Sequence, residues 1–519
     1  LKLIIISLLS LATTLIWIAG IMSYFNITVN VVSYLTFNLL MIIGASNAVH
    51  ILMKYHEGLS LGLDRHNSLK RVIEKIGAAL LLTSFTTAVG FFSLSMTNIK
   101  ITQQFGILVG SGVMIMFILN IIIMPILLNY ISIPGSSHVD RLMDNEKFKF
   151  ANKLNSFNKS HPYLIILFSI LIFFFSLIGL YKMNFNASVL EDLRPGNKIY
   201  DDIKYVENVF GGMLSIEVII DTEEELGGLD PIFLKKSQIL KNYILEIPEI
   251  SFAISPVDYI ILLNEEIGDG LRELPEDLED VLSLVIDYEP VQTLLSPNFS
   301  KYRISCRITD IPYSRGEAIR DKILSKSSSL FGSDIEVGIT GSTLMALSTN
   351  RHLVKNLTQS FMIAFIIIFI SIVILFRSVR LSLISILPNI IPLMIAGGLM
   401  GYLGIKLRPS TAMTFSIALG IAVDNTIHFL ARFRQELRED GDYERAVTNT
   451  LLTTGKAIMS TGVILSLGFF VLYFSEFVPN HEFGLLATII IITAVCASLI
   501  LLPVLILQIK PILRFKKDF

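Results

Sequence analysis

The sequence predicts a polytopic α-helical membrane protein with an internal repeat and one extracytoplasmic α+β domain. Of the 519 residues, 52% are hydrophobic and only 17% are charged, whereas soluble domains carry about a quarter. Ten apolar runs are each long enough to cross a bilayer. The chain also matches itself without a gap when it is shifted by 378 residues.

The apolar runs have about 20 residues each, the length that crosses the hydrocarbon layer of a membrane. They lie at 3–24, 32–53, 76–96, 104–129, 162–182, 357–376, 381–403, 411–431, 457–474 and 483–508. Lys and Arg cluster in every second link, at 54–75, 141–159, 376–380 and 432–456, and in the tail. Because positive links stay in the cytoplasm, we expect a multi-pass protein of the cell (inner) membrane. Its polar domain would lie outside the cytoplasm and its C-terminus inside.

The internal repeat is visible in short identical stretches. "GIMSYFNI" at 20–27 falls on "GLMGYLGI" at 398–405, and "NAVHIL" at 47–52 falls on "NTIHFL" at 425–430. Two halves of the same orientation predict a pseudo-two-fold axis along the membrane normal. Nothing before Leu1 corresponds to residues 160–378. We therefore expect a fragment that lacks two spans and one polar domain, a naturally shorter protein being the alternative.

The polar domain, residues 184–356, carries 29 acidic and 16 basic residues. Alternation and helical spacing predict strands and helices in the order β-α-β, insertion, β-α-β, which is the split ferredoxin-like pattern. The strands are expected at 213–221, 251–255, 302–310 and 335–340, the helices at 231–247 and 314–331, and an acidic helical insertion at 257–298. The acidic run "LPEDLED" at 274–280 is interpreted as a solvated helix start.

The predicted organisation has six segments. They are a first membrane repeat of four spans (1–131), a cytoplasmic linker (132–160), one span (161–183), the extracytoplasmic domain (184–356), a second membrane repeat of five spans (357–510) and a basic cytoplasmic tail (511–519). The two cysteines, Cys306 in the polar domain and Cys496 in a span, are not expected to pair.

A carboxylate in the middle of a predicted span is the sharpest indication of function. Asp424 lies within 411–431, and a charge at mid-membrane costs roughly 2.5–3.5 kcal/mol, so such acids are functional by default. The alternative is a carboxylate that caps a broken helix. Asp424, His428 and Arg432 share one helix face, and Ser46, His50 and Lys54 repeat that stripe in the first half. We expect the two stripes to face each other at the centre of the bundle.

Further polar residues around Asp424 complete a candidate proton relay. The predicted relay comprises Asp424, His428, Asn425, Ser46, Asn47, His50, Thr83 and Thr461. Histidines and hydroxyls in spans also make ordinary helix–helix hydrogen bonds, worth about 0.6 kcal/mol each. Lys54 and Arg432 are expected to anchor the membrane interface. No Walker A loop, HExxH, CxxC pair or GxSxG occurs, so neither a catalytic nor a metal or cofactor site is expected, and enzyme activity has no support.

Two long stretches resemble a known transporter family. "FRSVRLSLISILPNIIPLMIAGGLMGYLGIKL" at 376–407, followed by "GIAVDNTIHFLARFRQEL" at 420–437, is similar to the resistance–nodulation–division (RND) superfamily, in its predicted-exporter branch near the mycobacterial large membrane (MMPL-like) proteins. "PGNKIYDDIKYVENVFGG" at 195–212 and "ITGSTLMA" at 339–346 look like the start and end of its porter domain. The five-span repeat also resembles the sterol-sensing domain.

The resemblance implies an exporter of lipids or other hydrophobic compounds, driven by the proton-motive force through carboxylates on the central spans. The implied partners are membrane lipids and a hydrophobic or lipid substrate, with a homo-oligomer or a periplasmic partner left open and no nucleic acid. No cofactor beyond the proton gradient is implied. This chain departs from the family in its first half, where "GASNAVH" has Ser46 opposite Asp424, and Asn47 where relatives often have an acid. That loss favours the alternative, a non-pumping, sterol-sensing-like scaffold or regulator that binds lipid.

Overall fold

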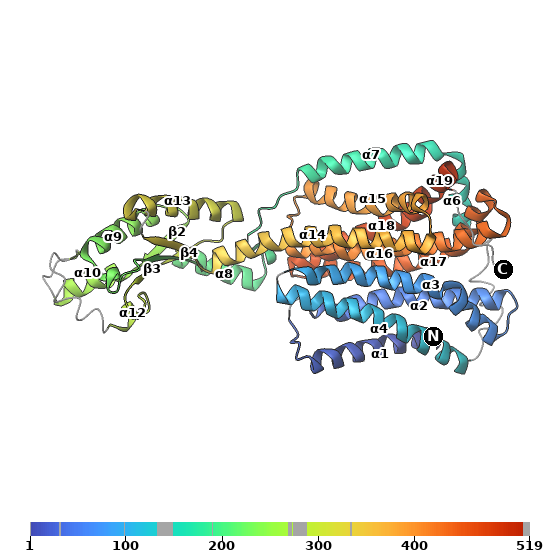
Figure 1. The fold of residues 1–519 in the computed structure, drawn as a ribbon, viewed down its shortest axis with the longest axis horizontal. Coiled ribbons are helices and arrows are strands. Elements are labelled where there is room, and N and C mark those ends of the chain that lie inside the picture. Colours follow the sequence, from blue (N-terminus) through green and yellow to red (C-terminus); the bar gives the residue numbers. More distant parts are fainter. Residues whose placement is uncertain are drawn as a thin grey trace. The chain divides into compact units, whose positions relative to one another are not determined.

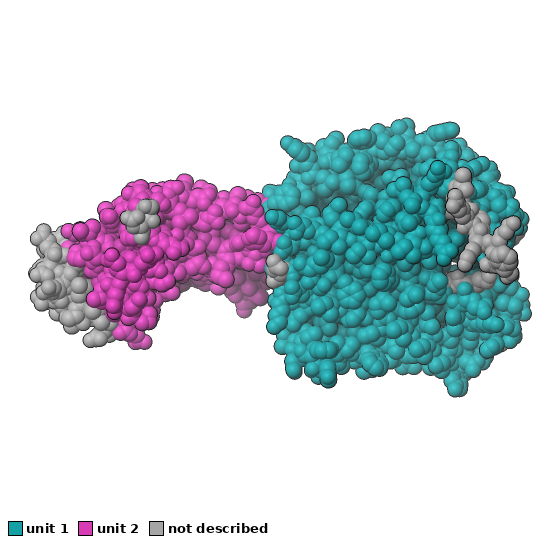
Figure 2. Space-filling view, in the orientation of Figure 1, with its two compact units in different colours: residues 1–185, 353–475, 479–519 teal, residues 186–352, 476–478 magenta. Residues whose placement is uncertain are grey.

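The computed structural model describes residues 2–511 except 31–32, 98, 132–148, 189, 268–271, 273, 275–287 and 333–334. Contacts divide the chain into two compact units, coloured separately in Figure 2. Unit 1 holds residues 1–185, 353–475 and 479–519, and unit 2 holds residues 186–352 and 476–478. The predicted solvated helix start at 274–280, apart from Leu274, and most of the predicted linker and basic tail lie outside the described residues.

Unit 1 is a bundle of long helices. Ten helices of the described chain are long and apolar enough to cross a membrane, as the sequence predicted. In chain order the unit contains α1 (Lys2–Tyr24), α2 (Leu35–Ser60), α3 (Arg65–Phe92), η1 (Ser93–Met96), α4 (Lys100–Tyr130), α6 (Lys149–Ser160), α7 (Pro162–Tyr181), the end of α14 (Ser342–Phe376), α15 (Val379–Leu403), α16 (Pro409–Asp440), α17 (Tyr443–Val471), η4 (Leu472–Phe474), α18 (Val478–Cys496), the π-turn η5 (Ala497–Leu501) and α19 (Leu502–Ile509) (Figure 1).

The repeat in the sequence is also a repeat in structure. Shifted by 378 residues, α1, α2, α3 and α4 fall within four residues of the ends of α15, α16, α17 and the α18–α19 helix. The contacts repeat too, because α2 packs against α3 and α17 while α16 packs against α17 and α3. The central four helices therefore have the arrangement expected of a two-fold axis, with α2 and α16 on its two sides.

Glycines bring two pairs of helices into backbone contact. A Cβ on Gly90 of α3 would lie 2.8 Å from the Ser416 carbonyl of α16, and one on Gly420 would lie 3.0 Å from Thr87 Cα. The Thr87 hydroxyl donates to the Gly420 carbonyl across the same crossing, at 3.2 Å. Small residues allow this close approach where lipid gives helices no hydrophobic drive to associate. Helix α7 meets α15 in the same way at Gly398, where a Cβ would lie 2.7 Å from Ser176 Cα.

The last span is interrupted by one turn of π-helix, Ala497–Leu501. A π-turn frees a backbone carbonyl from the regular hydrogen-bond ladder. Asn158, buried on α6, donates its side-chain amide to the Leu499 carbonyl at 2.9 Å. Thr426 of α16 lies beside the same turn, with its hydroxyl 3.4 Å from that of Ser498. The Leu499 carbonyl and the Ser498 hydroxyl of the π-turn thus form polar contacts with α6 and α16.

Unit 2 contains an antiparallel sheet of four strands in the order β2-β3-β1-β4. The β-α-β, β-α-β sequence of elements is the one predicted. Alternate side chains of β1, including Ile216, Val218 and Ile220, are fully buried in its core. The elements are η2 (Leu190–Asp192), α8 (Lys198–Phe210), β1 (Leu214–Asp221), η3 (Gly227–Leu229), α9 (Pro231–Leu245), β2 (Ile250–Ile254), α10 (Pro256–Ile267), α12 (Glu289–Gln292), β3 (Lys301–Ile308), α13 (Tyr313–Phe331) and β4 (Glu336–Thr340).

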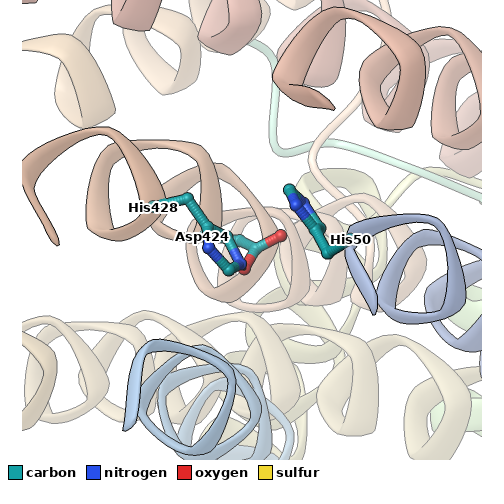
Figure 3. A group of neighbouring side chains, drawn as sticks. All are labelled: His50, Asp424 and His428. Atoms are coloured by element: carbon teal, nitrogen blue, oxygen red, sulfur yellow. The ribbon is translucent and has the colours of Figure 1, made fainter. Parts of the chain in front are cut away.

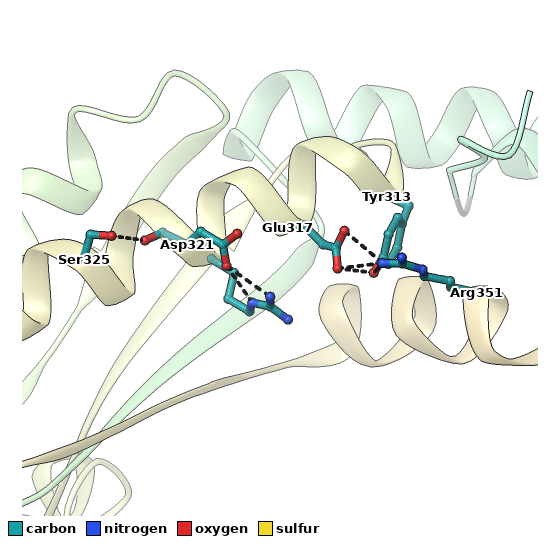
Figure 4. A network of polar contacts seen from close by, with 6 residues as sticks. Tyr313, Glu317, Asp321, Ser325 and Arg351 are labelled. Atoms are coloured by element: carbon teal, nitrogen blue, oxygen red, sulfur yellow. Dashed lines mark hydrogen bonds and ion pairs between the residues drawn. The ribbon is translucent and has the colours of Figure 1, made fainter.

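A polar network ties α13 to the first turns of α14 (Figure 4). The Arg351 guanidinium donates to Glu317 at 3.0 Å and to the Tyr313 hydroxyl at 2.6 Å. This region differs from the prediction, which began a helix only at residue 357. Helix α14 starts at Ser342, directly after Gly341, whose φ is 117°. No glycine or proline interrupts the chain after that point, so the helix continues unbroken to Phe376.

Candidate functional site

Helix α16 carries the candidate site, and it is almost entirely enclosed by the bundle. Every side chain from Ala418 to Leu430 is buried, including Asp424, which is 7% exposed. A span in contact with lipid would keep one apolar face exposed, as α7 does with its outward Leu and Phe side chains. The position of α16 at the centre of the bundle therefore removes its polar residues from lipid and turns them toward other helices.

Asp424, His428 and His50 converge on one point (Figure 3). One turn of α16 separates Asp424 from His428, and His428 Nε2 lies 3.4 Å from Asp424 Oδ1. From α2, the ring of His50 stacks on that of His428, with centroids 4.0 Å apart and planes 17° from parallel. Among the described residues, Asp424 Oδ1, His428 Nε2 and His50 Nε2 are buried without a hydrogen-bond partner. Three buried polar atoms thus face one another, ready to share a proton or a water.

Two cavities meet this cluster from opposite directions along the helices. The smaller, of about 10 Å³, lies among Ser46, Asn47, Thr83 and Asp424 and has room for about one water. The larger, of about 360 Å³, begins at His50 and His428 and runs to the exposed Ser60 and Leu61. We call the larger cavity the vestibule. Along both α2 and α16 the small cavity comes first and the vestibule second. Asp424 and the two imidazoles therefore separate two cavities.

The vestibule is strongly cationic. Lys54, Arg71, Arg432 and Lys456 line it, one from each of the four central helices, with Glu57 as the carboxylate among its lining residues. Glu57 is 2.7 Å from Lys54 Nζ and 3.6 to 3.7 Å from the guanidinium groups of Arg432 and Arg71. One carboxylate is thus shared by three cations.

The donor set of two imidazoles and one carboxylate could also hold a metal ion. Its ligand atoms lie within 4.8 Å of one another, and divalent transition metals accept such donors. The vestibule that leads to His50 and His428 is lined by Lys54, Arg71, Arg432 and Lys456, and their field opposes the approach of any cation, a divalent ion more than a proton.

The structure brings together most, but not all, of the predicted relay. His50, Asp424 and His428 form the cluster, and Ser46, Asn47 and Thr83 share the one-water cavity with Asp424. Asn425 follows Asp424 in the chain and is buried, and its Oδ1 accepts no hydrogen bond from the described residues. Thr461 lines neither described cavity. Its hydroxyl donates to the Ala457 carbonyl of its own helix at 3.0 Å, as the Thr83 hydroxyl does to the Leu80 carbonyl at 3.1 Å.

The prediction for Lys54 and Arg432 also needs correction. Both were expected to anchor the membrane interface, yet their side chains are only 8% and 18% exposed and turn into the vestibule. Sequence reasoning missed Glu57, Arg71 and Lys456 altogether. Glu57 could have been found from its i, i+3 spacing to Lys54. Arg71 and Lys456 could not, because their convergence depends on how four helices pack.

Comparison with known proteins finds one family model and two membrane proteins that are similar to this chain. The family model described as "MMPL family" matches residues 1–156 and 270–511. Membrane protein MJ1562 of Methanocaldococcus jannaschii is 25% identical over 382 residues, which cover 70% of this chain and 97% of that protein. Membrane protein SCO6666 of Streptomyces coelicolor is 24% identical over 198 residues, which are 37% of this chain and 28% of that longer protein.

Proposed function

Because the chain belongs to the MMPL family of membrane proteins, we propose that it is an RND-type exporter of lipids or other hydrophobic compounds, driven by protons that pass through Asp424. The observation that carries the proposal is the position of this carboxylate. It is buried, its Oδ1 lies 3.4 Å from His428 Nε2 but accepts no hydrogen bond from the described residues, and it lies between a one-water cavity and an open vestibule.

The proposed cycle uses the two forms of this carboxyl group. The protonated form is neutral and tolerated in a low dielectric, whereas the ionised form needs a nearby donor or water. A proton would arrive through a water held in the small cavity beside Ser46 and Thr83, move from Asp424 to His428 or His50, and leave through the vestibule. A potential of 100 mV supplies about 2.3 kcal/mol per charge moved. That energy would shift α16 and its partner α3 relative to the rest of the bundle.

Unit 2 would act as a ferredoxin-like, porter-type domain that handles the exported compound. Its antiparallel strand order β2-β3-β1-β4, with helices α9 and α13 following β1 and β3, supports a split βαβ architecture. The excess of acidic residues in 184–356 and the Lys and Arg of the opposite links support an extracytoplasmic location in a cell (inner) membrane.

The test is proton uptake in vesicles that contain the full-length protein with a pH-sensitive dye trapped inside. Asp424→Asn keeps the shape of the protonated side chain, so we expect a folded protein with proton flux lowered at least about tenfold. Glu74→Gln removes an exposed carboxylate of α3, 57% exposed in its pair with Lys70, and serves as the control. Export of a fluorescent lipid should fall in parallel with proton flux.

A second function is favoured by one observation, the serine at position 46. Only one half of the pseudo-symmetric pair keeps an acid, so a lipid-binding, sterol-sensing-like scaffold that does not pump is the alternative. Wild-type proton flux in Asp424→Asn would make this carboxylate structural and would favour the scaffold.

A further inference from the structure

The vestibule carries more positive charge than the proposed relay needs. Among the residues that the structure describes, four cationic side chains line it, and Glu57 is the one acidic lining residue. Arg432 has a second partner, Glu436, at 2.6 Å, but Glu436 also accepts a hydrogen bond from Asn449 at 2.8 Å. Lys54, Arg71 and Arg432 thus share two carboxylates, Glu57 and Glu436, which leaves one of these three cations in excess. Lys54 is nearly fully buried, so solvent does little to compensate it.

The internal repeat explains how this excess arises. Lys54 and Arg432 occupy equivalent positions of the two halves, so the axis brings one cation from each half to the vestibule. Glu57 is equivalent to Gln435, which also lines the vestibule but has no charge. A symmetric site would have two carboxylates here. The second half therefore supplies Arg432, the equivalent of Lys54, but has Gln435 in place of the acid Glu57.

Anchoring to the membrane surface does not account for these side chains. A lysine that serves as an anchor extends its ammonium to water, as Lys70 of α3 does with 62% of its side chain exposed. The next residue, Arg71, instead turns into the vestibule, with 29% exposed. The Nε atoms of Arg71 and Arg432 are both buried donors without an acceptor among the described residues. The Arg71 and Arg432 side chains line a space of about 360 Å³, and the planar fork of a guanidinium suits an oxyanion.

We propose that the vestibule binds a phosphate group, which bridges Lys54 and Arg71 of the first half to Arg432 of the second. Thr453 and Thr454 of α17 also line the space. The Thr453 hydroxyl already donates to the Asn449 carbonyl of its own helix at 2.7 Å, so Thr454 is the one of the two that can supply a further donor to a phosphate oxygen. A volume of about 360 Å³ equals roughly a dozen waters at about 30 Å³ each, which is ample for a phosphoryl group and part of its ester. Free phosphate and the headgroup of an anionic phospholipid share this chemistry.

The first arm of the test measures free phosphate. The full-length protein in detergent is titrated with inorganic phosphate at constant ionic strength, and the thermal unfolding midpoint is followed. We expect a saturable rise that chloride does not produce. Arg71→Gln should weaken the apparent affinity at least about tenfold, the effect of one lost charge-assisted hydrogen bond. Lys70→Gln, one residue away but outside the vestibule, should change it less than about twofold.

A variant that is expected to bind phosphate more tightly distinguishes an effect on the site from damage to the fold. Glu57→Gln removes the acidic lining residue, so we expect phosphate to bind about tenfold more tightly. A misfolded protein would not gain affinity. If phosphate gives no saturable effect, or if Glu57→Gln binds no more tightly than wild type, free phosphate is not a ligand of this site.

The second arm measures lipid. The protein is purified from vesicles of phosphatidylcholine with one tenth phosphatidylglycerol, and retained lipids are counted by native mass spectrometry. Retention of phosphatidylglycerol that is lost in Arg71→Gln and kept in Lys70→Gln would identify the lipid headgroup as the source. The proposal is overturned if neither arm distinguishes these two variants. Neither arm requires transport, so the result is independent of whether the protein pumps protons.

Discussion

The imidazole rings of His50 and His428 stack 4.0 Å apart, although 378 residues separate them in the chain. This separation equals the shift of the internal repeat, so the two histidines are equivalent positions of the two halves. Equivalent residues can touch only where the symmetry axis passes between them. The stacked pair therefore marks the pseudo-two-fold axis. Asp424, whose equivalent in the first half is Ser46, lies beside it on one side only.

The first prediction concerns the two histidines. We expect His428→Ala to lower proton flux less than Asp424→Asn, because the stacked ring of His50 remains beside the carboxyl group and can still exchange its proton. The double variant His50→Ala with His428→Ala should then approach the loss seen in Asp424→Asn. Flux is measured in dye-loaded vesicles at matched protein levels. A double variant that is no slower than either single one would remove the histidines from the pathway.

The second prediction concerns the one-water cavity shared by Ser46 and Asp424. In a protein with both native cysteines changed to serine, cysteines at positions 46 and 424 should be joined by a short bifunctional thiol reagent. Proteolysis between the halves and gel migration measure the link. A control pair uses position 424 with position 16, whose isoleucine is 71% exposed on α1. Equal linking of both pairs would contradict the described packing.

The third prediction compares two equivalent glycines. A Cβ at Gly398 would lie 2.7 Å from the Ser176 backbone of α7, whereas at its counterpart Gly20 nothing lies within 4 Å. We expect Gly398→Ala to destabilise by about 1–3 kcal/mol, the cost of overpacking. Gly20→Ala should be neutral or slightly stabilising, because alanine favours a helix by about 0.5–1 kcal/mol. Thermal unfolding in detergent measures both, and equal midpoints would argue against a tight α7–α15 contact.

The fourth prediction concerns the thiol of Cys306 on β3. Burial, with a smaller contribution from the charge of Glu217, raises its pKa to about 12. The native thiol should therefore resist maleimide from pH 7 to pH 9, while the unfolded thiol, with a pKa of about 8.5, reacts faster as pH rises. Because the folded pKa is the higher one, this group's contribution to stability is complete below about pH 8.5 and declines above it.

The measurement for the thiol uses Cys496→Ser, which leaves Cys306 as the one remaining cysteine. Labelling is followed against denaturant concentration, and it should begin only where unit 2 unfolds. Rapid labelling of the native protein would show that β3 opens locally, in conflict with a side chain that is 1% exposed.

The sequence was sufficient for those features that repeat or alternate along the chain. The length of the apolar runs predicted the spans, and the 378-residue match identified α2 and α16 as equivalent helices. Alternation of apolar residues located β1 within one residue of its observed start at Leu214. The stripe of Asp424 and His428 was visible because one helix carries both. By contrast, the vestibule draws Lys54, Arg71, Arg432 and Lys456 from four helices. No local pattern contains such a convergence, because each cation taken alone resembles an ordinary membrane-surface residue.

The two equivalent crossings between the halves are not built alike. Where α3 crosses α16, Gly90 meets the Ser416 carbonyl and Gly420 meets the Thr87 backbone, so main chain lies on main chain. Where α17 crosses α2, Gly468 instead meets the side chain of Ile42, whose Cγ1 would lie 2.9 Å from an added Cβ. A side chain can change rotamer and a backbone cannot. The α3–α16 contact should therefore stay fixed when the bundle changes shape. Movement between the halves should instead take place at the α2–α17 crossing, where a side chain can adjust.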